Sequence, residues 1–240
     1  MAAQNDIVTI TKWLVQHLSQ LRFSPPVSHV YNPLEYAQKS YLKYARLYGQ
    51  GQRDVLLIGM NPGPWGMIQN GVPFGDYVMV QDWLKISAPV GRPLIEHPKR
   101  PVLGFENTRR EVSGKRLWGW AQERFHTPDV FFQRFFVLNY CPLAFFDESG
   151  RNLTPDKLRA GDRDSLIDVC DQALWRSVEY FQPRWVVGVG GFAEASARRA
   201  LDHQNIDIGR IPHPSPANPA ANQGWAEAAT KQLLDLGIKL

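Results

Sequence analysis

Four short apolar runs place the strongest limit on what this chain can fold into. They cover residues 54–60 (DVLLIGM), 135–140 (FFVLNY), 184–190 (RWVVGVG) and 207–213 (DIGRIPH). Each run is rich in Val, Ile or aromatic residues and ends at or next to Gly, Pro or Asn, which predicts a β-strand. Helical patterns lie between and after the runs, around residues 115–125, 164–181, 192–203 and 218–236. Strands that alternate with helices predict a doubly wound α/β fold.

The rest of the chain predicts one domain. Its 240 residues are enough for one large α/β domain, and they contain no internal repeat, low-complexity tract or obvious linker. We therefore expect a single domain over residues 1–240. The first 21 residues predict an amphipathic helix, without the apolar core of a signal peptide or a membrane span. Residues 74–110 and 142–155 predict long irregular segments that pack over a site.

Composition narrows the possible classes of function. The formal charge of +4 is a mild basic bias, compatible with a polyanionic partner such as DNA. Two distant cysteines, Cys141 and Cys170, exclude a structural zinc site of the usual kind and a four-cysteine iron–sulfur cluster. They also fit a reducing compartment. The lack of a basic tail favours a bacterial cytoplasm, with the nucleus as the alternative for a eukaryotic protein.

Polar side chains follow three of the predicted strands. Asn61 follows the first strand, Asn139 ends the second, and His213 follows the fourth, while Gly190-Gly191 leads from the third into a helix. Ligands of open α/β sheets bind beyond the carboxyl ends of the strands, so these groups are expected to converge on one pocket. No Asp or Glu stands among them. Each residue alone also fits an ordinary turn or loop.

Three other functional motifs are incomplete in this sequence. The corner after Gly59 lacks the Gly-Lys-Ser/Thr ending of a phosphate-binding P-loop. The GVGGFAE segment at residues 188–194 lacks the full dinucleotide-binding pattern, and tight packing of a helix on a strand explains its glycines. Ser215 does not stand in the Gly-x-Ser-x-Gly context of a hydrolase nucleophile.

Several motifs together resemble one family. They are GMNPGPWGM at residues 59–67, GVPFG at 71–75, NYCPL at 139–143 and HPSPANPAANQGW at 213–225. These segments resemble the single-strand-selective monofunctional uracil-DNA glycosylases. Similar segments at residues 31–37, 96–104, 111–114 and 150–155 extend the resemblance from about Tyr31 to near the C-terminus. The first 30 residues carry no family signal.

The resemblance implies a fold and an activity. The fold is a short central parallel sheet flanked by helices, and the partner is single- or double-stranded DNA. The reaction is hydrolysis of the N-glycosidic bond of a flipped-out uracil, which leaves an abasic site. Asn61 is expected to position the attacking water, and His213 to stabilise the leaving base. Because no Lys lies in these motifs, we expect a monofunctional enzyme without metal or organic cofactor.

The resemblance also assigns base-binding residues. Asn139 is expected to donate to uracil O4 and accept from N3–H, a pattern that cytosine reverses. Phe74 is expected to stack on the base, and the backbone at Met60 to face it. Gly63 is expected to leave space beside C5 of the base, which implies tolerance of 5-substituted uracils such as 5-hydroxymethyluracil. A tight turn would also explain this glycine.

A loop after the last strand is expected to enter the DNA stack. The resemblance assigns this wedge to Pro214, Ser215, Pro216, Ala217 and Asn218. Ala217 stands where the vertebrate pattern has Arg, and it cannot fill a base-sized gap in a duplex. Trp65 in place of Phe is a milder departure. Lys99 and Arg100 are candidates for phosphate contacts, and a solvated charge pair explains them equally well.

Two alternatives stay open. One is an enzyme of the same fold directed at hypoxanthine or xanthine, and the other is a module that binds damaged DNA without cleaving it. A small-molecule nucleosidase is a third class, which would not need the wedge. We expect the protein to be a monomer.

Overall fold

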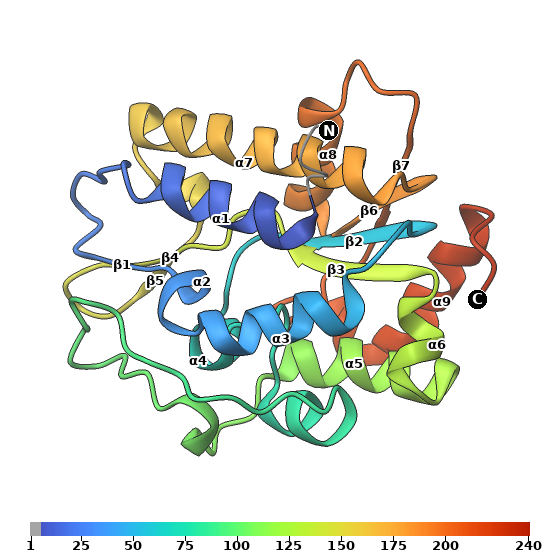
Figure 1. Ribbon diagram of the computed structural model, residues 1–240, viewed down its shortest axis with the longest axis horizontal. Helices are drawn as coiled ribbons and strands as arrows, with labels where there is room; N and C mark the ends of the chain where they lie inside the picture. Colours follow the sequence, from blue (N-terminus) through green and yellow to red (C-terminus); the bar gives the residue numbers. More distant parts are fainter. Residues whose placement is uncertain (1–5) are drawn as a thin grey trace.

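A four-stranded parallel sheet forms the centre of the computed structural model, which describes residues 6–240 (Figure 1). The strands are β2 (Val55–Gly59), β3 (Phe135–Asn139), β6 (Trp185–Val189) and β7 (Asp207–Ile211). Their order across the sheet is β3-β2-β6-β7, and all neighbours are parallel. The four predicted strands are confirmed. The last one ends at Ile211, because Pro212 has no backbone N–H to continue the ladder, and this places His213 in the following loop.

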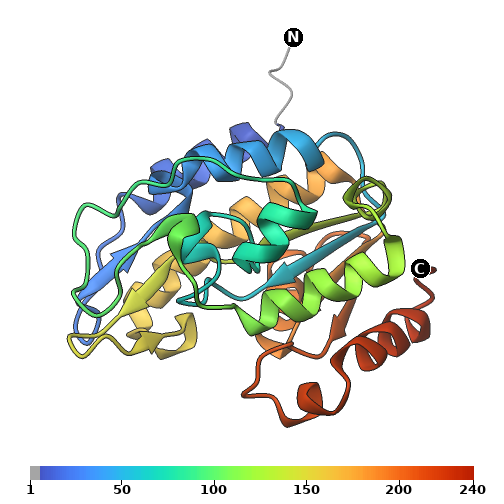
Figure 2. The ribbon, with the colours of Figure 1, turned by 90° about the horizontal axis from the view of Figure 1, so that it is seen from below.

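Helices cover both faces of this sheet, as predicted (Figures 1 and 2). On one side lie α1 (Ile7–Leu18), α7 (Ala160–Phe181) and α8 (Gly191–Ala200), and on the other lie α5 (Val112–Phe125) and α9 (Trp225–Asp235). No helix within residues 6–240 has both the length and the apolar character that crossing a membrane requires.

Two predicted helices have different bounds in the structure. The N-terminal helix begins at Ile7, after Asp6 accepts a hydrogen bond from Thr9 N, and residues 1–5 of the expected helix lie outside the described residues. The C-terminal helix is divided at Gly224, whose φ of +118° is incompatible with a helix. A 3₁₀ turn, η4 (Pro219–Gln223), therefore precedes α9.

Several elements lay outside the sequence prediction. Helix α3 (Gln38–Tyr48) lies at the outer edge of β3, where the Tyr44 hydroxyl donates to the Val137 carbonyl at 2.7 Å. Helix α3 therefore provides a hydrogen-bond partner for a backbone carbonyl that an open sheet edge would leave unpaired. Two short helices, α2 (Pro33–Tyr36) and α6 (Pro128–Phe132), precede α3 and β3.

The segments expected to be irregular contain short regular elements. An antiparallel sheet joins β1 (His29–Tyr31), β4 (Ala144–Phe146) and β5 (Asn152–Leu153). Strands of two or three residues are too short to show an alternating pattern. Four short helical turns complete the described chain: α4 (Met67–Asn70), the π-helix η1 (Met79–Trp83), and the 3₁₀ turns η2 (Gly104–Glu106) and η3 (Pro155–Lys157).

The loop between α4 and η1 holds Phe74 in an unusual backbone conformation. Phe74 has a φ of +52°, in the left-handed region that most side chains avoid. The buried Asn70 side chain holds this loop, since it accepts from Val72 N at 3.0 Å and donates to the Gly75 carbonyl. Gly114 of α5 packs so closely beneath the loop that a Cβ atom there would overlap with the Phe74 carbonyl oxygen. Helix α5 thus supports Phe74 from below.

We expect Gly114→Ala to lower the free energy of unfolding by about 1–3 kcal/mol, because the added methyl group would displace the Phe74 loop. Gly119→Ala is the matched control in the same helix, since nothing lies within 4 Å of the added atom. It should raise the free energy of unfolding by up to about 1 kcal/mol, the helix preference for Ala over Gly. Urea denaturation of both variants measures the difference, and equal effects would show that Gly114 does not support the loop.

Candidate active site

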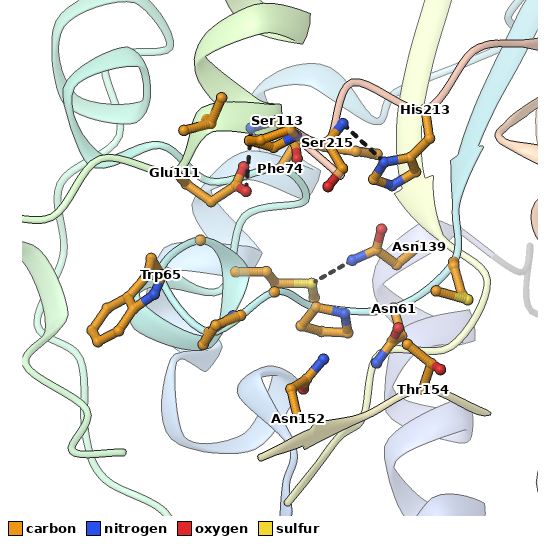
Figure 3. A pocket seen from close by; sticks show the side chains of 18 of the residues that line it. Asn61, Trp65, Phe74, Glu111, Ser113, Asn139, Asn152, Thr154, His213 and Ser215 are labelled. Carbon is orange, nitrogen blue, oxygen red and sulfur yellow. Dashed lines mark hydrogen bonds between the residues drawn. The ribbon is translucent and has the colours of Figure 1, made fainter. Parts of the chain in front are cut away.

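A cavity of about 400 Å³ opens beyond the carboxyl ends of β2, β3 and β7 (Figure 3). Residues 60–67 and 109–113 form much of its wall, and Phe74, Asn139, Asn152, Thr154, His213, Ser215 and Pro216 complete it. The six residues predicted to act in catalysis or base binding all line this cavity: Met60, Asn61, Gly63, Phe74, Asn139 and His213. Its volume is typical of a pocket for a small ligand.

Asn139 is held at the end of β3 by two residues that the sequence analysis did not single out. It lies directly opposite Gly59 of β2 in the parallel ladder. A Cβ atom at Gly59 would overlap with Asn139 Oδ1 and lie 2.7 Å from Phe74 Cζ, so a larger residue here would displace both side chains. Asn139 Nδ2 donates to Met67 Sδ at 3.2 Å, which leaves its second N–H and its carbonyl oxygen for a ligand. A glycine inside a strand is a signal of such close approach.

His213 is held in one neutral tautomer. Its Nδ1 accepts a hydrogen bond from the Ser215 backbone N–H at 3.1 Å, so the proton of the neutral ring is on Nε2. Burial lowers the pKa of His213 from its ordinary value. The ring lies beside Phe74, with 6.4 Å between the ring centroids. His213 therefore presents an uncharged N–H donor near the face of an aromatic ring.

Asn61 is oriented by a carbonyl group from the loop before β4. Its Nδ2 donates to the Leu143 carbonyl at 3.3 Å. Among residues 6–240 no donor pairs with its Oδ1, which leaves that oxygen as an acceptor. Figure 3 shows Asn61, Asn139 and His213 along one side of the cavity, the side formed by the strand ends. Three strands thus deliver the three polar groups to one place, as predicted.

The cavity also contains a carboxyl group, which the sequence analysis did not expect. Glu111 precedes α5, and its side chain accepts hydrogen bonds from Ser113 N and Gly114 N at the start of the helix. Burial raises the pKa of Glu111, and the two backbone N–H groups oppose this shift. Behind it, the fully buried Asp76 forms a bidentate pair with Arg110, with both distances 2.7 Å.

Basic and aromatic side chains surround the mouth of the cavity. The Arg109 guanidinium lies 4.3 Å from the centroid of the Trp65 ring, and that of Arg100 lies 5.9 Å from it. Arg100 also donates to the Gly150 carbonyl at 2.6 Å, so it is partly engaged within the fold. Lys99 is exposed. The predicted phosphate contacts of Lys99 and Arg100 stay predictions, and Arg109 joins them as a candidate.

Hydrogen bonds within the predicted wedge loop and from α5 hold this loop in place. Ser215 and Pro216 line the cavity, whereas Pro214 is buried below it and Ala217 is exposed at the tip. Asn218 Nδ2 donates to the His213 carbonyl at 3.0 Å, and Ala217 N donates to Ser215 Oγ at 3.2 Å.

Arg116 of α5 is the external brace. Its guanidinium donates to the Pro214 carbonyl at 2.8 Å and to Asn222 Oδ1 at 2.9 Å. Asn222 in turn donates to the Pro216 carbonyl at 3.0 Å. Arg116 carried no recognisable signal in the sequence, and the motif at residues 213–225 contains Asn222 without singling it out. Their partners are backbone carbonyls and a side chain distant along the chain.

No group of three His, Cys, Asp or Glu side chains within residues 6–240 is placed to hold a metal ion. The expectation that the protein needs neither metal nor cofactor stays a prediction.

Comparison with known proteins identifies the family. Residues 47–234 match the model of the uracil DNA glycosylase superfamily. The chain belongs to this superfamily. Within it, the chain is 49% identical over 223 residues to a single-strand selective monofunctional uracil DNA glycosylase of Mus musculus, covering 92% of this chain and 80% of that protein. The Rattus norvegicus protein is 50% identical over 223 residues, with the same two coverages.

A solved structure has the same fold. The crystal structure of wild-type Pedobacter heparinus SMUG2 matches with a TM-score of 0.68 and covers 96% of this chain and 99% of that one. At 15% identity this match supports a shared fold and nothing further. The predicted family and the predicted sheet flanked by helices are both confirmed.

We expect His213 to be neutral at pH 7, protonated on Nε2, with a pKa below the ordinary value of about 6.5. Nitrogen-15 NMR of the imidazole during a pH titration measures both properties, with His213→Gln to assign the signals. An Nδ1–H tautomer, or a pKa at or above that value, would contradict the structure.

The same pKa shift has a consequence for stability. Below pH about 6.5 the unfolded chain takes up the proton first. The free energy of unfolding should therefore decrease as the pH falls from that value through the lower pKa of the folded state. His213→Gln should remove this part of the pH dependence.

Proposed function

We propose that this chain hydrolyses the N-glycosidic bond of a uracil flipped out of DNA and leaves an abasic site. The observation that carries the proposal is one cavity that Asn61, Phe74, Asn139 and His213 line together. The family supports it, since its vertebrate relatives are named as single-strand selective monofunctional uracil DNA glycosylases. DNA, single- or double-stranded, is the proposed partner.

Asn139 would select the base. Its free N–H would donate to uracil O4 and its carbonyl oxygen would accept from uracil N3–H, while cytosine offers the opposite groups at both positions. The hydrogen bond to Met67 Sδ keeps the amide from turning over. Stacking of the base on the Phe74 ring would add about 1–3 kcal/mol of binding free energy. A site with oriented hydrogen-bonding groups rejects a wrong base strongly, because it would leave those groups unpaired.

His213 would stabilise the leaving base. As the glycosidic bond breaks, negative charge would move onto the uracil ring, and Nε2–H would donate to O2. One such donor in a water-poor site lowers a barrier by about 2.7–4 kcal/mol. Because the ring is held neutral, it gives a hydrogen bond without transferring a proton.

Asn61 would position the attacking water through its free Oδ1. An amide is a weak base, but a cation-like sugar needs only a well-placed water. No lysine lines the cavity within residues 6–240, so a Schiff base with the sugar has no candidate amine. We therefore propose a monofunctional reaction. The expectations from the sequence that it needs no metal or cofactor, and that a monomer carries it out in the bacterial cytoplasm, are part of the proposal.

We expect the wild type to release uracil from a labelled oligonucleotide in the presence of EDTA. Asn139→Ala and His213→Ala should each lower the rate about a hundredfold or more, through lost base recognition and lost charge stabilisation. The oligonucleotides carry uracil, 5-hydroxymethyluracil, hypoxanthine, xanthine or thymine, each in single and double strands.

The same oligonucleotides can also contradict the proposed function. Strong release of hypoxanthine or xanthine with negligible release of uracil would favour the purine-directed alternative. Binding to DNA without release of any base would leave a module that recognises damaged DNA.

We expect Arg116→Ala to slow uracil release from duplex DNA about tenfold, and from single strands less than threefold, since only a duplex must be entered by the wedge loop. Lys115→Ala, which removes one exposed charge from the same helix, is the control for general attraction to phosphates. Equal losses on both substrates would contradict a role of Arg116 through the wedge loop.

A further inference from the structure

Glu111 occupies the side of the cavity opposite His213. Figure 3 shows the two side chains on opposite sides, with Phe74 between them. The sequence motif EVSG, which contains Glu111, has no task in the reaction proposed above. A carboxyl group in a pocket for an uncharged base is unexpected, because burying it costs free energy that an apolar wall would not.

The position of Glu111 relative to the base follows from the other contacts. Under the proposed function, O2 of the base faces His213, and N3–H with O4 face Asn139. C5 lies across the pyrimidine ring from C2, so the 5-position faces the wall opposite His213. That wall contains Gly63 and Glu111. A Cβ atom at Gly63 would lie 3.9 Å from Glu111 Oε1, and no other atom within residues 6–240 comes within 4 Å of it.

The glycine corner makes room for this carboxyl group. A Cβ atom at Gly66 would lie only 2.8 Å from Glu111 Cγ, so the side chain lies flat against the backbone of the corner. Glu111 thus reaches the space that Gly63 leaves open beside the base.

Capping of α5 does not by itself account for a glutamate. Short side chains such as Ser, Thr, Asp and Asn are the preferred N-cap residues, and Glu is not among them. Both oxygens of Glu111 accept from backbone N–H groups, and these hydrogen bonds favour the charged form of the carboxyl group. A carboxylate has about four acceptor positions, which leaves acceptor capacity on the cavity side.

We propose that Glu111 is a specificity-determining residue that selects among 5-substituted uracils by charge and hydrogen bonding. The inference rests on the proposed function. A hydroxyl-bearing substituent would donate to the carboxylate. An anionic substituent such as 5-carboxyl would be repelled by it, and a methyl group would remove water from it without replacing a hydrogen bond.

The test compares Glu111→Gln with the wild type on single-stranded oligonucleotides that carry uracil, 5-hydroxymethyluracil or 5-carboxyluracil. In the variant, kcat/KM for 5-carboxyluracil relative to uracil should rise about tenfold or more, because the like charge is removed. The relative value for 5-hydroxymethyluracil should fall several-fold, since a charge-assisted hydrogen bond becomes a neutral one. Because each rate is taken relative to uracil in the same protein, a general loss of activity in the variant does not affect the comparison.

Glu111→Asp is the second variant. It keeps the charge and a preferred capping group but withdraws the carboxylate by one methylene, so the relative rate for 5-carboxyluracil should rise by less than in Glu111→Gln. It also provides the decisive comparison if Glu111→Gln does not fold. Thermal denaturation of each variant monitors folding.

The outcomes separate this inference from the function on which it rests. Unchanged substrate ratios in a folded variant that still releases uracil would overturn the role of Glu111 alone. A wild type that releases no uracil would overturn the proposed function, and this inference with it.

Discussion

The parallel register between β2 and β3 is the constraint on which the rest of the site depends. It places Gly59 directly opposite Asn139, and the missing side chain of Gly59 is what allows Asn139 and Phe74 to lie together at the end of the sheet. Because β7 ends at the same edge, His213 enters the same cavity. The site is therefore a direct product of strand alignment, and a shift of one residue along β3 would point Asn139 to the other face of the sheet.

The three polar side chains at the strand ends are each oriented by an uncharged group. Ser215 N–H selects the tautomer of His213, the Leu143 carbonyl turns Asn61, and Met67 Sδ holds Asn139. Such contacts fix direction without adding a competing charge near the reacting atoms. The arrangement suits a reaction whose barrier falls through preformed dipoles.

The sequence predicted the strands and the residues at their ends well, because buried parallel strands form continuous apolar runs with abrupt polar ends. It did not predict β1, β4 and β5, whose two or three residues are too short for a pattern. It also missed Met67, Glu111 and Arg116. These residues act through contacts that only the folded chain forms, and the motifs that contain Met67 and Glu111 do not reveal those contacts.

Helix α5 connects the Phe74 loop at the cavity with the predicted wedge loop. Its first turn supports Phe74 through Gly114. Arg116, two residues further along the helix, donates to the Pro214 carbonyl of the wedge loop. The spacing between the cavity and the predicted wedge loop is thus set by a rigid element rather than by the loop itself. This matters for engineering. A wedge loop grafted from a relative would need to keep a carbonyl within reach of Arg116 and an acceptor in the place of Asn222, or it would lose its anchorage regardless of what its tip contributes to the DNA.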